Sequence, residues 1–509
     1  MQLGFVIDHS KCIGCHACTV ACKAENDVPV GNFRTWVKYT ESGKFPEVRR
    51  SFAVLRCNQC TDAPCVTICP VHALEKRADG IIDVDPDRCI GCKSCMQGCP
   101  YDALYLNDES GTAEKCHFCA HRTEIGLAPA CAVVCPTEAI IPGDFDDPNS
   151  RVSQLRKTGE LSARKTEAGT GPNVLYIETD SAGLNPLETQ AGTGFLWANQ
   201  IPGIQLDAHA FAAAEEQASS RTVYDVEHPP LWGGMVSAYL WTKSVSAGLF
   251  LAGLWFLPTI GSGGAPRLWR LGLALALGFL TVTTVLLVAD LKRPERFLFI
   301  LRHANWDSWL TRGSVVLMGY AALLSAWLAI DLLGLRPGGW LSALLAATTA
   351  LAALATAIYT AWLFGQAKGR VLWMRRGLAL ELAIHAALAG SAAWILLVLA
   401  TGDAGQARLG VLRALAVAFC AAQLVLQWAA PRMAPAKREE EYARAYRLVV
   451  AGPFATRHKL TKIAAALAIL LFAIPGQPLV WGVAAVLSLA MLALEQDTLI
   501  RAGQALSIS

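Results

Sequence analysis

The distribution of apolar residues changes near residue 230. Before that point, apolar residues come in short runs that glycine, proline and polar residues interrupt. Beyond it, the chain holds eight stretches apolar enough to cross a membrane, which takes about 20 such residues. These predicted spans are 234–259, 267–289, 313–335, 340–364, 373–401, 408–430, 460–475 and 478–500. Eight spans return the end of the chain to the side of the membrane where its first part lies.

Composition supports a chain of two unlike parts. Of the 509 residues, 53% are hydrophobic and only 17% are charged, against about 25% in ordinary soluble domains. Sixteen of the 17 cysteines lie between Cys12 and Cys135, and Cys420 falls inside an apolar span. The sequence therefore predicts a cysteine-rich head over 1–178, a linker over 179–229 and a membrane domain over 230–509. Within the linker, residues 206–221 have the pattern of one exposed helix.

Charge sets the expected location of the protein. The net charge of +3 gives no reason to expect a nucleic-acid partner. Residues 1–10 show none of the basic, apolar or twin-arginine features of an export signal. The loops between spans hold seventeen Lys and Arg residues on the side of the head and five on the far side, and such an excess marks the cytoplasmic side. We therefore expect a multi-pass protein of the bacterial inner membrane, with its head in the cytoplasm.

The cysteines of the head form four groups of four. The first and third groups share the spacing C-x2-C-x2-C-x3-C, the second is C-x2-C-x4-C-x3-C, and the fourth is C-x2-C-x11-C-x3-C. The members are Cys12, Cys15, Cys18 and Cys22; Cys57, Cys60, Cys65 and Cys69; Cys89, Cys92, Cys95 and Cys99; and Cys116, Cys119, Cys131 and Cys135.

This spacing is typical of [4Fe–4S] clusters. Three close thiolates hold one cluster, while the fourth cysteine reaches the other cluster of a pair. Sixteen cysteines thus match four [4Fe–4S] clusters. Zinc also binds paired C-x2-C units, but the third close cysteine of groups one and three fits zinc poorly. The run Cys12-Ile-Gly-Cys15-His16 matches a c-type haem attachment site, yet that interpretation leaves Cys18 and Cys22 unexplained.

The segments CIGCHACTVACKAENDVPVG, RCNQCTDAPCVTICP, DRCIGCKSCMQGCPY and KCHFCAHR resemble the four-cluster ferredoxin subunits of molybdopterin oxidoreductases. The resemblance covers about residues 3–178 and implies an α+β, bis-dicluster ferredoxin-like head. It also implies a catalytic partner subunit with a bis-molybdopterin guanine dinucleotide (bis-MGD) cofactor. The implied ligand sets are Cys12, Cys15 and Cys18 with Cys135; Cys116, Cys119 and Cys131 with Cys22; Cys57, Cys60 and Cys65 with Cys99; and Cys89, Cys92 and Cys95 with Cys69.

A second resemblance lies in the membrane domain. The run Asp290-Leu-Lys-Arg-Pro-Glu-Arg-Phe297, followed by Leu301-Arg302 and Trp306-Asp-Ser-Trp309, resembles the NrfD/polysulfide-reductase membrane anchors. It implies an all-α domain of eight transmembrane helices that exchanges ubiquinone or menaquinone with the quinone pool of the lipid. Head and anchor are commonly separate subunits in such complexes, whereas this chain fuses them.

A quinone site needs an apolar slot, hydrogen-bond donors and a route for protons. Ionisable residues inside spans are costly, so they are functional candidates by default. The candidates gather toward the side of the head: Lys243 with the neighbouring Tyr239 and Trp241 in the first span, Asp290 and Arg293 at the mouth of the second, Tyr359 in the fourth, and Glu381 and His385 on one face of the fifth. Each also has a structural interpretation, as a snorkelling lysine, part of an aromatic belt, or an ion pair within the bundle or its loops. As a set they favour a quinone site over an inert anchor.

The sequence thus predicts an electron-transfer and quinone-reacting subunit. It shows no phosphate-binding loop and no catalytic-triad signature, so we expect the substrate to be converted in the partner subunit. A cytoplasmic head favours a dehydrogenase complex for sulfite or formate. The alternatives are a quinol-oxidising subunit of a polysulfide, thiosulfate or dimethyl sulfoxide (DMSO) reductase, a proton-translocating module suggested by Glu381 and His385, and an anchor whose head gives electrons to a soluble carrier.

Overall fold

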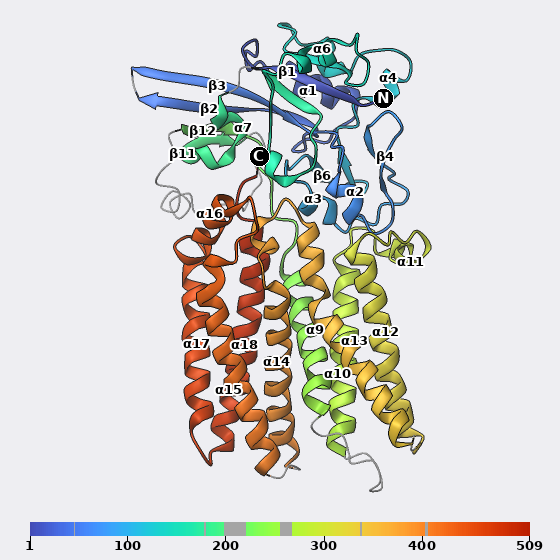
Figure 1. The fold of residues 1–509 in the computed structure, drawn as a ribbon, viewed down its shortest axis with the longest axis vertical. Helices are drawn as coiled ribbons and strands as arrows, with labels where there is room; N and C mark the ends of the chain where they lie inside the picture. Colours follow the sequence, from blue (N-terminus) through green and yellow to red (C-terminus); the bar gives the residue numbers. More distant parts are fainter. Residues whose placement is uncertain are drawn as a thin grey trace.

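A computed structural model describes residues 1–44, 46–177, 180–197, 220–254, 267–335, 338–402 and 406–508. A head of strands and short helices sits on one end of a bundle of long helices (Figure 1). The blue to green first part of the chain forms the head, and the green to red remainder forms the bundle. The end of the chain returns to the junction between the two.

One sheet joins strands from the beginning and the end of the head segment. Strand β1 (Leu3–Asp8) pairs in parallel with β10 (Val174–Ile177) and antiparallel with β8 (Ile140–Asp144), and β10 also pairs with β9 (Ser162–Ala163). Five of the six residues of β1 are buried, as a central strand covered on both faces requires. The head therefore forms one unit from its first strand to residue 177.

The range 179–229, for which we expected a linker, adds structure to the head. Strand β12 (Ser220–Asp225) pairs with β2 (Thr35–Lys44) of the long hairpin that β2 forms with β3 (Glu47–Arg56). On its other side β12 pairs with β11 (Thr189–Trp197). The hairpin offered an unpaired edge, and a strand that covers such an edge satisfies its backbone groups. The predicted helix over 206–221 lies outside the described residues up to 219, and residues 220 and 221 belong to β12.

The remaining elements of the head are short and carry the cysteines. They are α1 (Ala17–Glu25), α2 (Pro64–Ile68), β4 (Leu74–Lys76), β5 (Ile82–Val84), α3 (Ser94–Gly98), β6 (Leu104–Asn107), β7 (Thr112–Lys115), α4 (Ala120–Thr123), α5 (Ala130–Val133), α6 (Arg151–Lys157), the 3-10 turns η1 (Thr166–Ala168) and η2 (Pro186–Glu188), and α7 (Ser181–Leu184). Strands β4 and β5 form one two-stranded hairpin, and β6 and β7 form another.

The bundle consists of long helices that run between its two ends (Figure 1). These are α9 (Gly234–Gly253), α10 (Arg267–Ala289), α12 (Trp309–Leu332), α13 (Gly339–Gln366), α14 (Leu378–Thr401), α15 (Gln406–Ala429), α17 (Ala455–Ala473) and α18 (Pro478–Gly503). Short elements link them on the side of the head: η4 (Pro294–Arg296), α11 (Phe299–Arg302), η5 (Val371–Met374), η6 (Ala430–Arg432) and α16 (Glu439–Val450).

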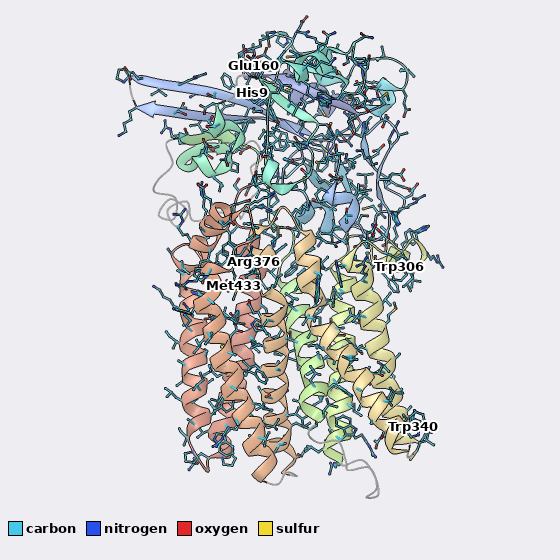
Figure 2. The ribbon with its side chains drawn as sticks, in the orientation of Figure 1. His9, Glu160, Trp306, Trp340, Arg376 and Met433 are labelled. Atoms are coloured by element: carbon cyan, nitrogen blue, oxygen red, sulfur yellow. The ribbon has the colours of Figure 1, made fainter. Side chains whose placement is uncertain are left out.

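Six of the long helices are apolar enough on their own to cross a membrane. They are α10, α12, α13, α14, α15 and α18. Helix α9 includes Lys243, and α17 begins with Arg457, Lys459 and Lys462, so both are less apolar although they stand in the same bundle. The exposed tryptophans Trp306 and Trp340 mark the head-side and far ends of the bundle (Figure 2), as aromatic residues do at the two interfaces of a membrane.

Three predicted spans begin several residues away from where the sequence indicated. The third was predicted from residue 313, but α12 starts at Trp309. The fifth was predicted from residue 373, but 371–374 form η5 and the helix starts at Leu378. Gly377 breaks the run because its φ of 83° lies in the left-handed region, which glycine adopts most easily. The seventh was predicted from residue 460, but α17 already starts at Ala455, because its first turns are polar and carry no apolar signal.

Helices α9 and α14 approach each other closely at the centre of the bundle. Gly248 of α9 faces Gly390 of α14, and a side chain on either would collide with the backbone of the other helix. Small residues permit this close packing in membranes. The contact brings the polar residues of α9 near those of α14.

The last helix ties the bundle to the head. The Oε1 atom of Gln504, just beyond α18, accepts hydrogen bonds from the backbone amides of Leu231 and Trp232 and from Gln97 of α3, over 3.0–3.1 Å. Its amide nitrogen donates to the Trp232 carbonyl over 2.8 Å. One side chain thus joins the end of the chain, the entry to α9 and the head.

Candidate functional site

None of the 17 cysteines forms a disulfide bond, and most of them are buried. In each of the four groups the residue before the second cysteine has a positive φ: Gly14 (70°), Gln59 (44°), Gly91 (67°) and Phe118 (61°). A residue in the left-handed region makes the loop turn tightly there, so that the cysteines on either side of it can face one common centre. Glycine fills two of the positions without steric cost, while Gln59 and Phe118 hold the same turn with a side chain.

We call the first and fourth cysteine groups along the chain the outer groups, and the second and third the inner groups. The fourth cysteine of each outer group lies beside cysteines of the other outer group, as the resemblance implied. Burial, and then the nearby Cys116, Cys131 and Cys119, raise the pKa of the Cys22 thiol. Burial, and then Cys135 and Cys15, raise the pKa of Cys12. The third and fourth cysteines stand four residues apart, so they lie on one helix face, one turn from each other. The third cysteine stays with the two preceding thiols of its group, while the fourth, one turn further on, reaches the other group of the pair.

The two inner groups cross in the same way. Burial raises the pKa of Cys65 well above its ordinary value, and Cys99 and Cys57 raise it further. Burial, and then Cys69, raise the pKa of Cys92. Thiols gathered in this way would stay protonated without a cation, whereas iron holds them as thiolates. The donor set therefore fits an iron–sulfur cluster.

Hydrogen-bond donors surround the sulfur atoms. Backbone amides lie near Cys69 Sγ (Ala73, 3.3 Å), Cys135 Sγ (Ala139, 3.3 Å) and Cys89 Sγ (Ala113, 3.5 Å). The fully buried Arg56 donates to Cys131 Sγ over 3.2 Å. Donors to cluster sulfur are among the features that set a reduction potential.

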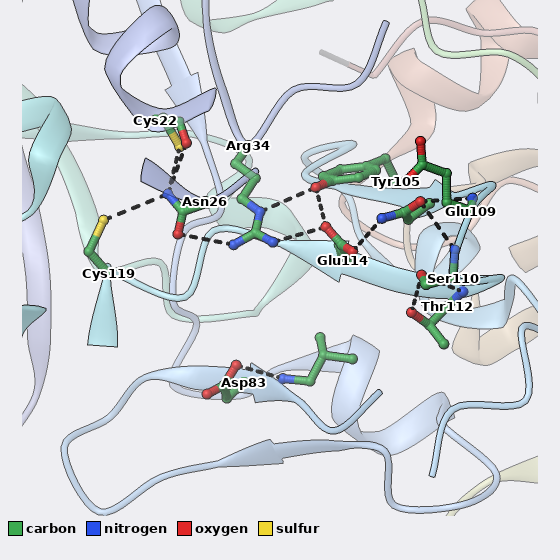
Figure 3. A network of polar contacts seen from close by, with 12 residues as sticks. Cys22, Asn26, Arg34, Asp83, Tyr105, Glu109, Ser110, Thr112, Glu114 and Cys119 are labelled. Atoms are coloured by element: carbon green, nitrogen blue, oxygen red, sulfur yellow. Dashed lines mark hydrogen bonds and ion pairs between the residues drawn. The ribbon is translucent and has the colours of Figure 1, made fainter. Parts of the chain in front are cut away.

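A polar network joins the outer thiols to the opposite side of the head (Figure 3). The Asn26 amide lies 3.6 Å from Cys22 Sγ and 4.0 Å from Cys119 Sγ. Arg34 donates to Asn26 over 3.3 Å and to Glu114 over 2.9 Å. Glu114 stands on β7, whose hairpin turn carries the Ser110 carbonyl that accepts from Arg293 of the membrane domain over 2.6 Å.

The inner thiols rest directly on the bundle. The loop before α12 holds the end of the cysteine-bearing helix α2: Asn305 donates to the Cys69 carbonyl over 2.7 Å and Ser308 donates to the Ile68 carbonyl over 2.8 Å. A side chain at Gly369 would collide with the Cys99 carbonyl. The part of the head with the inner groups is therefore the part nearest the membrane.

A largely apolar cavity of about 340 Å³ opens beneath the inner thiols. Its wall includes Cys92 and Ser94 of the head, Trp232 and Tyr239 from the start of α9, and residues of α10, α11, α12 and α13. The size is that of a pocket for a small organic molecule, and a few polar groups in an apolar wall are typical of such sites. This cavity touches one of the inner thiols and the membrane interior at once.

Three of the residues predicted for a quinone site line this cavity: Tyr239, Asp290 and Tyr359. Asp290 pairs with Lys93 of the head over 3.0 Å. Lys243 stands behind the wall, with its ammonium 4.5 Å from the centre of the Tyr359 ring and a hydrogen bond to the Thr360 hydroxyl. Lys243 thus contacts α13, the helix that carries Tyr359, at two successive residues.

Two predicted residues point elsewhere. Trp241 donates to the Leu489 carbonyl over 3.0 Å and packs against Phe279, because two residues along a helix rotate the side-chain direction about 200° away from that of Tyr239. Arg293 contacts the head through Ser110. Their roles in the structure are packing and docking.

Glu381 and His385 belong to a different group of residues. They lie with Glu495 of α18, and Arg375 donates to both oxygens of Glu381 over 2.6 and 2.5 Å. A cavity of about 50 Å³ adjoins Glu381, Glu495 and His458. The sequence reasoning missed Glu495, Arg375 and His458, because helical periodicity shows which residues share one helix face and not which helix packs against it.

The fold and the thiol sets define an iron–sulfur electron-transfer protein attached to a helical membrane domain. The family model described as "4Fe-4S dicluster domain" matches residues 48–145, and the model described as "Polysulphide reductase, NrfD" matches residues 223–507, more than half of the chain. The protein belongs to the polysulphide reductase NrfD family, with an iron–sulfur dicluster domain fused ahead of the membrane domain. It is thus a multi-pass membrane protein of electron transfer with [4Fe–4S] clusters.

The curated relatives match the head. A tetrathionate reductase subunit of Salmonella typhimurium is 44% identical over 194 residues, which cover 37% of this chain and 78% of the relative. A putative dimethyl sulfoxide reductase iron-sulfur subunit of Halobacterium salinarum is 39% identical over 217 residues, 37% of this chain and 83% of the relative. A polysulfide reductase chain of Wolinella succinogenes is 36% identical over 186 residues, 36% of this chain and 97% of the relative.

Proposed function

We propose that this protein carries electrons between a catalytic molybdopterin subunit and a quinone bound in the cavity at the head-side end of the bundle. The observation that carries the proposal is that Cys92 lines the same cavity as Tyr239, Asp290 and Tyr359. Four [4Fe–4S] clusters, held by the sixteen cysteines, would supply one-electron steps along the head. The proposed domains are a head over 1–178, continued by β12, and a membrane domain over 230–509 with eight spans.

The residues of the cavity suit a quinone. Its apolar wall accepts the ring and the start of the tail, while the Tyr239 and Tyr359 phenols can donate to the carbonyl oxygens. Reduction of a quinone to a quinol takes up two electrons and two protons. The Lys243 ammonium beside the Tyr359 ring places a proton donor next to the phenols, and the Asp290–Lys93 pair places a second ionisable group on the side of the head.

The opposite end of the head suits a protein partner. Cys15 is exposed, and Cys12 and Cys135 are half-buried. The apolar side chains of Ile13, Val20 and Val133 are exposed on the same loops and helices, by 57%, 65% and 61%. Exposed apolar residues around a redox centre favour a docked partner. We take this partner to be a subunit with bis-MGD, since the relatives named above are parts of reductases and the resemblance of the head implies it.

Two directions of electron flow remain open to test. The excess of Lys and Arg on the side of the head supports a cytoplasmic dehydrogenase, for sulfite or formate, that reduces quinone. The names of the relatives, which are parts of tetrathionate, polysulfide and dimethyl sulfoxide reductases, support a subunit that oxidises quinol instead. The same cavity serves both directions, because a site that binds both quinone and quinol catalyses both reactions.

The test uses the full chain, with its clusters loaded, in lipid vesicles. The clusters are reduced with dithionite, a short-chain ubiquinone or menaquinone analogue is added, and reoxidation is followed by visible absorbance. We expect Ser314→Trp, which fills the cavity, to block quinone-dependent reoxidation. Tyr239→Phe should slow it about tenfold, the loss of a hydrogen bond to developing charge. Trp241→Phe, two residues away on another face of α9, is the matched control and should keep the original rate.

Equal rates in all three variants would show that electrons do not leave through this cavity. That result would favour the anchor interpretation, in which a soluble carrier meets the head. Iron content and the absorbance of the oxidised clusters, measured on each variant, separate loss of the quinone site from loss of the clusters.

A further inference from the structure

A second buried group of ionisable residues occupies the other half of the bundle. The His385 side chain is fully buried, and its Nε2 atom lies 3.9 Å from Glu381 Oε1 and 3.7 Å from Glu495 Oε2. Both distances exceed a hydrogen bond. Among the described residues, neither His385 Nε2 nor Glu495 Oε2 has a hydrogen-bond partner. An unpaired buried nitrogen therefore points between two carboxylates.

The charges of this group do not balance without a proton. Arg375 neutralises Glu381 by donating to both of its oxygens. Glu495 receives only neutral donors, because the amides of Gln423 and Gln427 each donate to its Oε1 over 2.7 Å. A second negative charge in the membrane interior is expensive unless it is compensated. One proton shared between Glu495 and His385 removes that cost.

A metal ion fits this group poorly. Both oxygens of Glu381 are taken by Arg375, whose positive charge repels a cation. One imidazole nitrogen and one carboxylate oxygen remain, fewer ligands than zinc or magnesium takes from a protein site. The donor set favours a proton.

A cavity large enough for water adjoins the group. This cavity of about 50 Å³ lies beside Glu381 and Glu495, and its wall also includes the polar side chains of Tyr446, His458 and Thr461. The polar groups that line this cavity from neighbouring elements are Arg375 from the loop before α14, Gln427 from α15, Tyr446 from α16 and His458 from α17. Outside the cavity, Gln423 of α15 contacts Glu495, Gln496 of α18 contacts His385, and Tyr442 of α16 lies near Glu381.

The group also connects to the wall of the quinone cavity. The Gln496 amide lies 3.4 Å from His385 Nδ1 and 3.2 Å from Ser244 Oγ. Ser244 follows Lys243 on α9, and the Lys243 ammonium lies 4.5 Å from the centre of the Tyr359 ring, in the wall of the quinone cavity. The close packing of α9 on α14 at Gly248 and Gly390 makes this connection short.

We propose that Glu381, His385 and Glu495 form a proton-binding site that exchanges one proton with the quinone cavity and is refilled from water on the side of the head. When a quinone takes two electrons and two protons, this site supplies one of the protons and then takes another from water. When a quinol is oxidised, the site accepts that proton and releases it by the same route. The inference rests on the proposed function, since it needs a quinone in the first cavity.

The experiment is redox-difference infrared spectroscopy on the full chain with loaded clusters in lipid, with the ubiquinone analogue present. Reduction in H2O and then in D2O should change a carboxyl C=O band that shifts on deuteration. We expect Glu495→Gln to remove this band and to slow quinone reduction about tenfold. Asp497→Asn is the control on the same helix, because Asp497 pairs with Arg457 and Arg501 outside the cavity, and it should leave the band in place.

The outcomes separate this site from the quinone site. If the original protein does not reduce the quinone, the proposed function fails. If it does, and Glu495→Gln and His385→Gln both keep the band and the rate, only the proton site fails. A stoichiometric metal other than iron that Glu495→Gln loses would also overturn the proposal. If Glu495→Gln does not fold, Glu495→Asp, which keeps a carboxyl, should shift the band, and an unshifted band would refute the assignment.

Discussion

Arg56 carries a positive charge into the interior of the head. Its side chain is fully buried beside the Phe5 ring, and its Nη1 atom donates to Cys131 Sγ. Burial opposes the charge, but Cys131, Cys116 and Cys18 hold the pKa of the guanidinium above its ordinary value. These cysteines come from both outer thiol sets. A fixed cation between two redox centres stabilises the electron on each of them.

We therefore expect Arg56→Met to lower the midpoint potentials of the two outer clusters. The shift should be on the order of a tenfold change in the ratio of reduced to oxidised cluster, which is about 59 mV for one electron. Arg56→Lys keeps the charge and should retain most of the potential. Redox titration followed by electron paramagnetic resonance measures both variants. Unchanged potentials in Arg56→Met, with full iron content, would show that the guanidinium serves packing alone.

At the scale of elements, one loop of the membrane domain completes a helix of the head. The last carbonyls of a helix lack partners within it. At the end of α2 and just beyond it, the loop before α12 and the first turn of α12 supply them: Asn305 donates to the Val66 and Cys69 carbonyls, Ser308 to Ile68, and Thr311 to Pro70. The junction is thus built from hydrogen bonds to backbone that carries a cluster ligand.

Removing one of these donors should loosen the junction. We expect Asn305→Ala to destabilise the contact by about 1–3 kcal/mol, since it leaves buried carbonyls unpaired. Hydrogen–deuterium exchange at the amides of residues 65–69 should become faster than in the original protein. Asp307→Ala removes an exposed side chain of the same loop and should leave the exchange unchanged. Equal exchange in both variants would contradict the capping role.

At the scale of the whole molecule, the basic residues on the side of the head serve two purposes. Six of the seventeen contact the head directly, namely Lys292, Arg293, Arg296, Lys368, Arg370 and Arg444. A residue that docks the head is placed there whichever side of the membrane the head occupies. The charge excess that remains, eleven against five, still predicts a cytoplasmic head.

Orientation can be measured with a pair of matched insertions. A specific protease sequence in the turn of the β2–β3 hairpin, after Lys44, lies on the head, and the same sequence at Gly476, between α17 and α18, lies at the far end (Figure 1). In inside-out vesicles we expect cleavage at the hairpin and protection at Gly476, with the reverse in right-side-out vesicles. The opposite pattern would place the head outside and favour the quinol-oxidising reductase.

The sequence predicted what depends on local spacing. The positions of thiols three and four residues apart depend only on the local backbone. The spacing and the resemblance therefore predicted that Cys22 and Cys99 each lie with the other cysteine group of their pair. The apolar helices could also be located, because each is a long uninterrupted run of apolar residues. The neighbours of Glu381 and His385 could not be predicted from the sequence, because Glu495 stands more than a hundred residues later, on a helix whose packing no local pattern encodes. Tyr239 and Trp241 were grouped by proximity in sequence although they face different helices.

The head is held to the bundle by the hydrogen bonds of Gln504 and by the short connection through residues 226–233, and this covalent link has a consequence for assembly. The association of two separate subunits depends on their concentrations in the cell. A head tethered to the bundle by a few residues instead meets it at an effective concentration of about millimolar or above. The head–bundle contact should therefore survive dilution into detergent that parts two-chain relatives. A cell that makes this protein also makes both halves in equal number, so no head is left to donate electrons without a membrane beneath it.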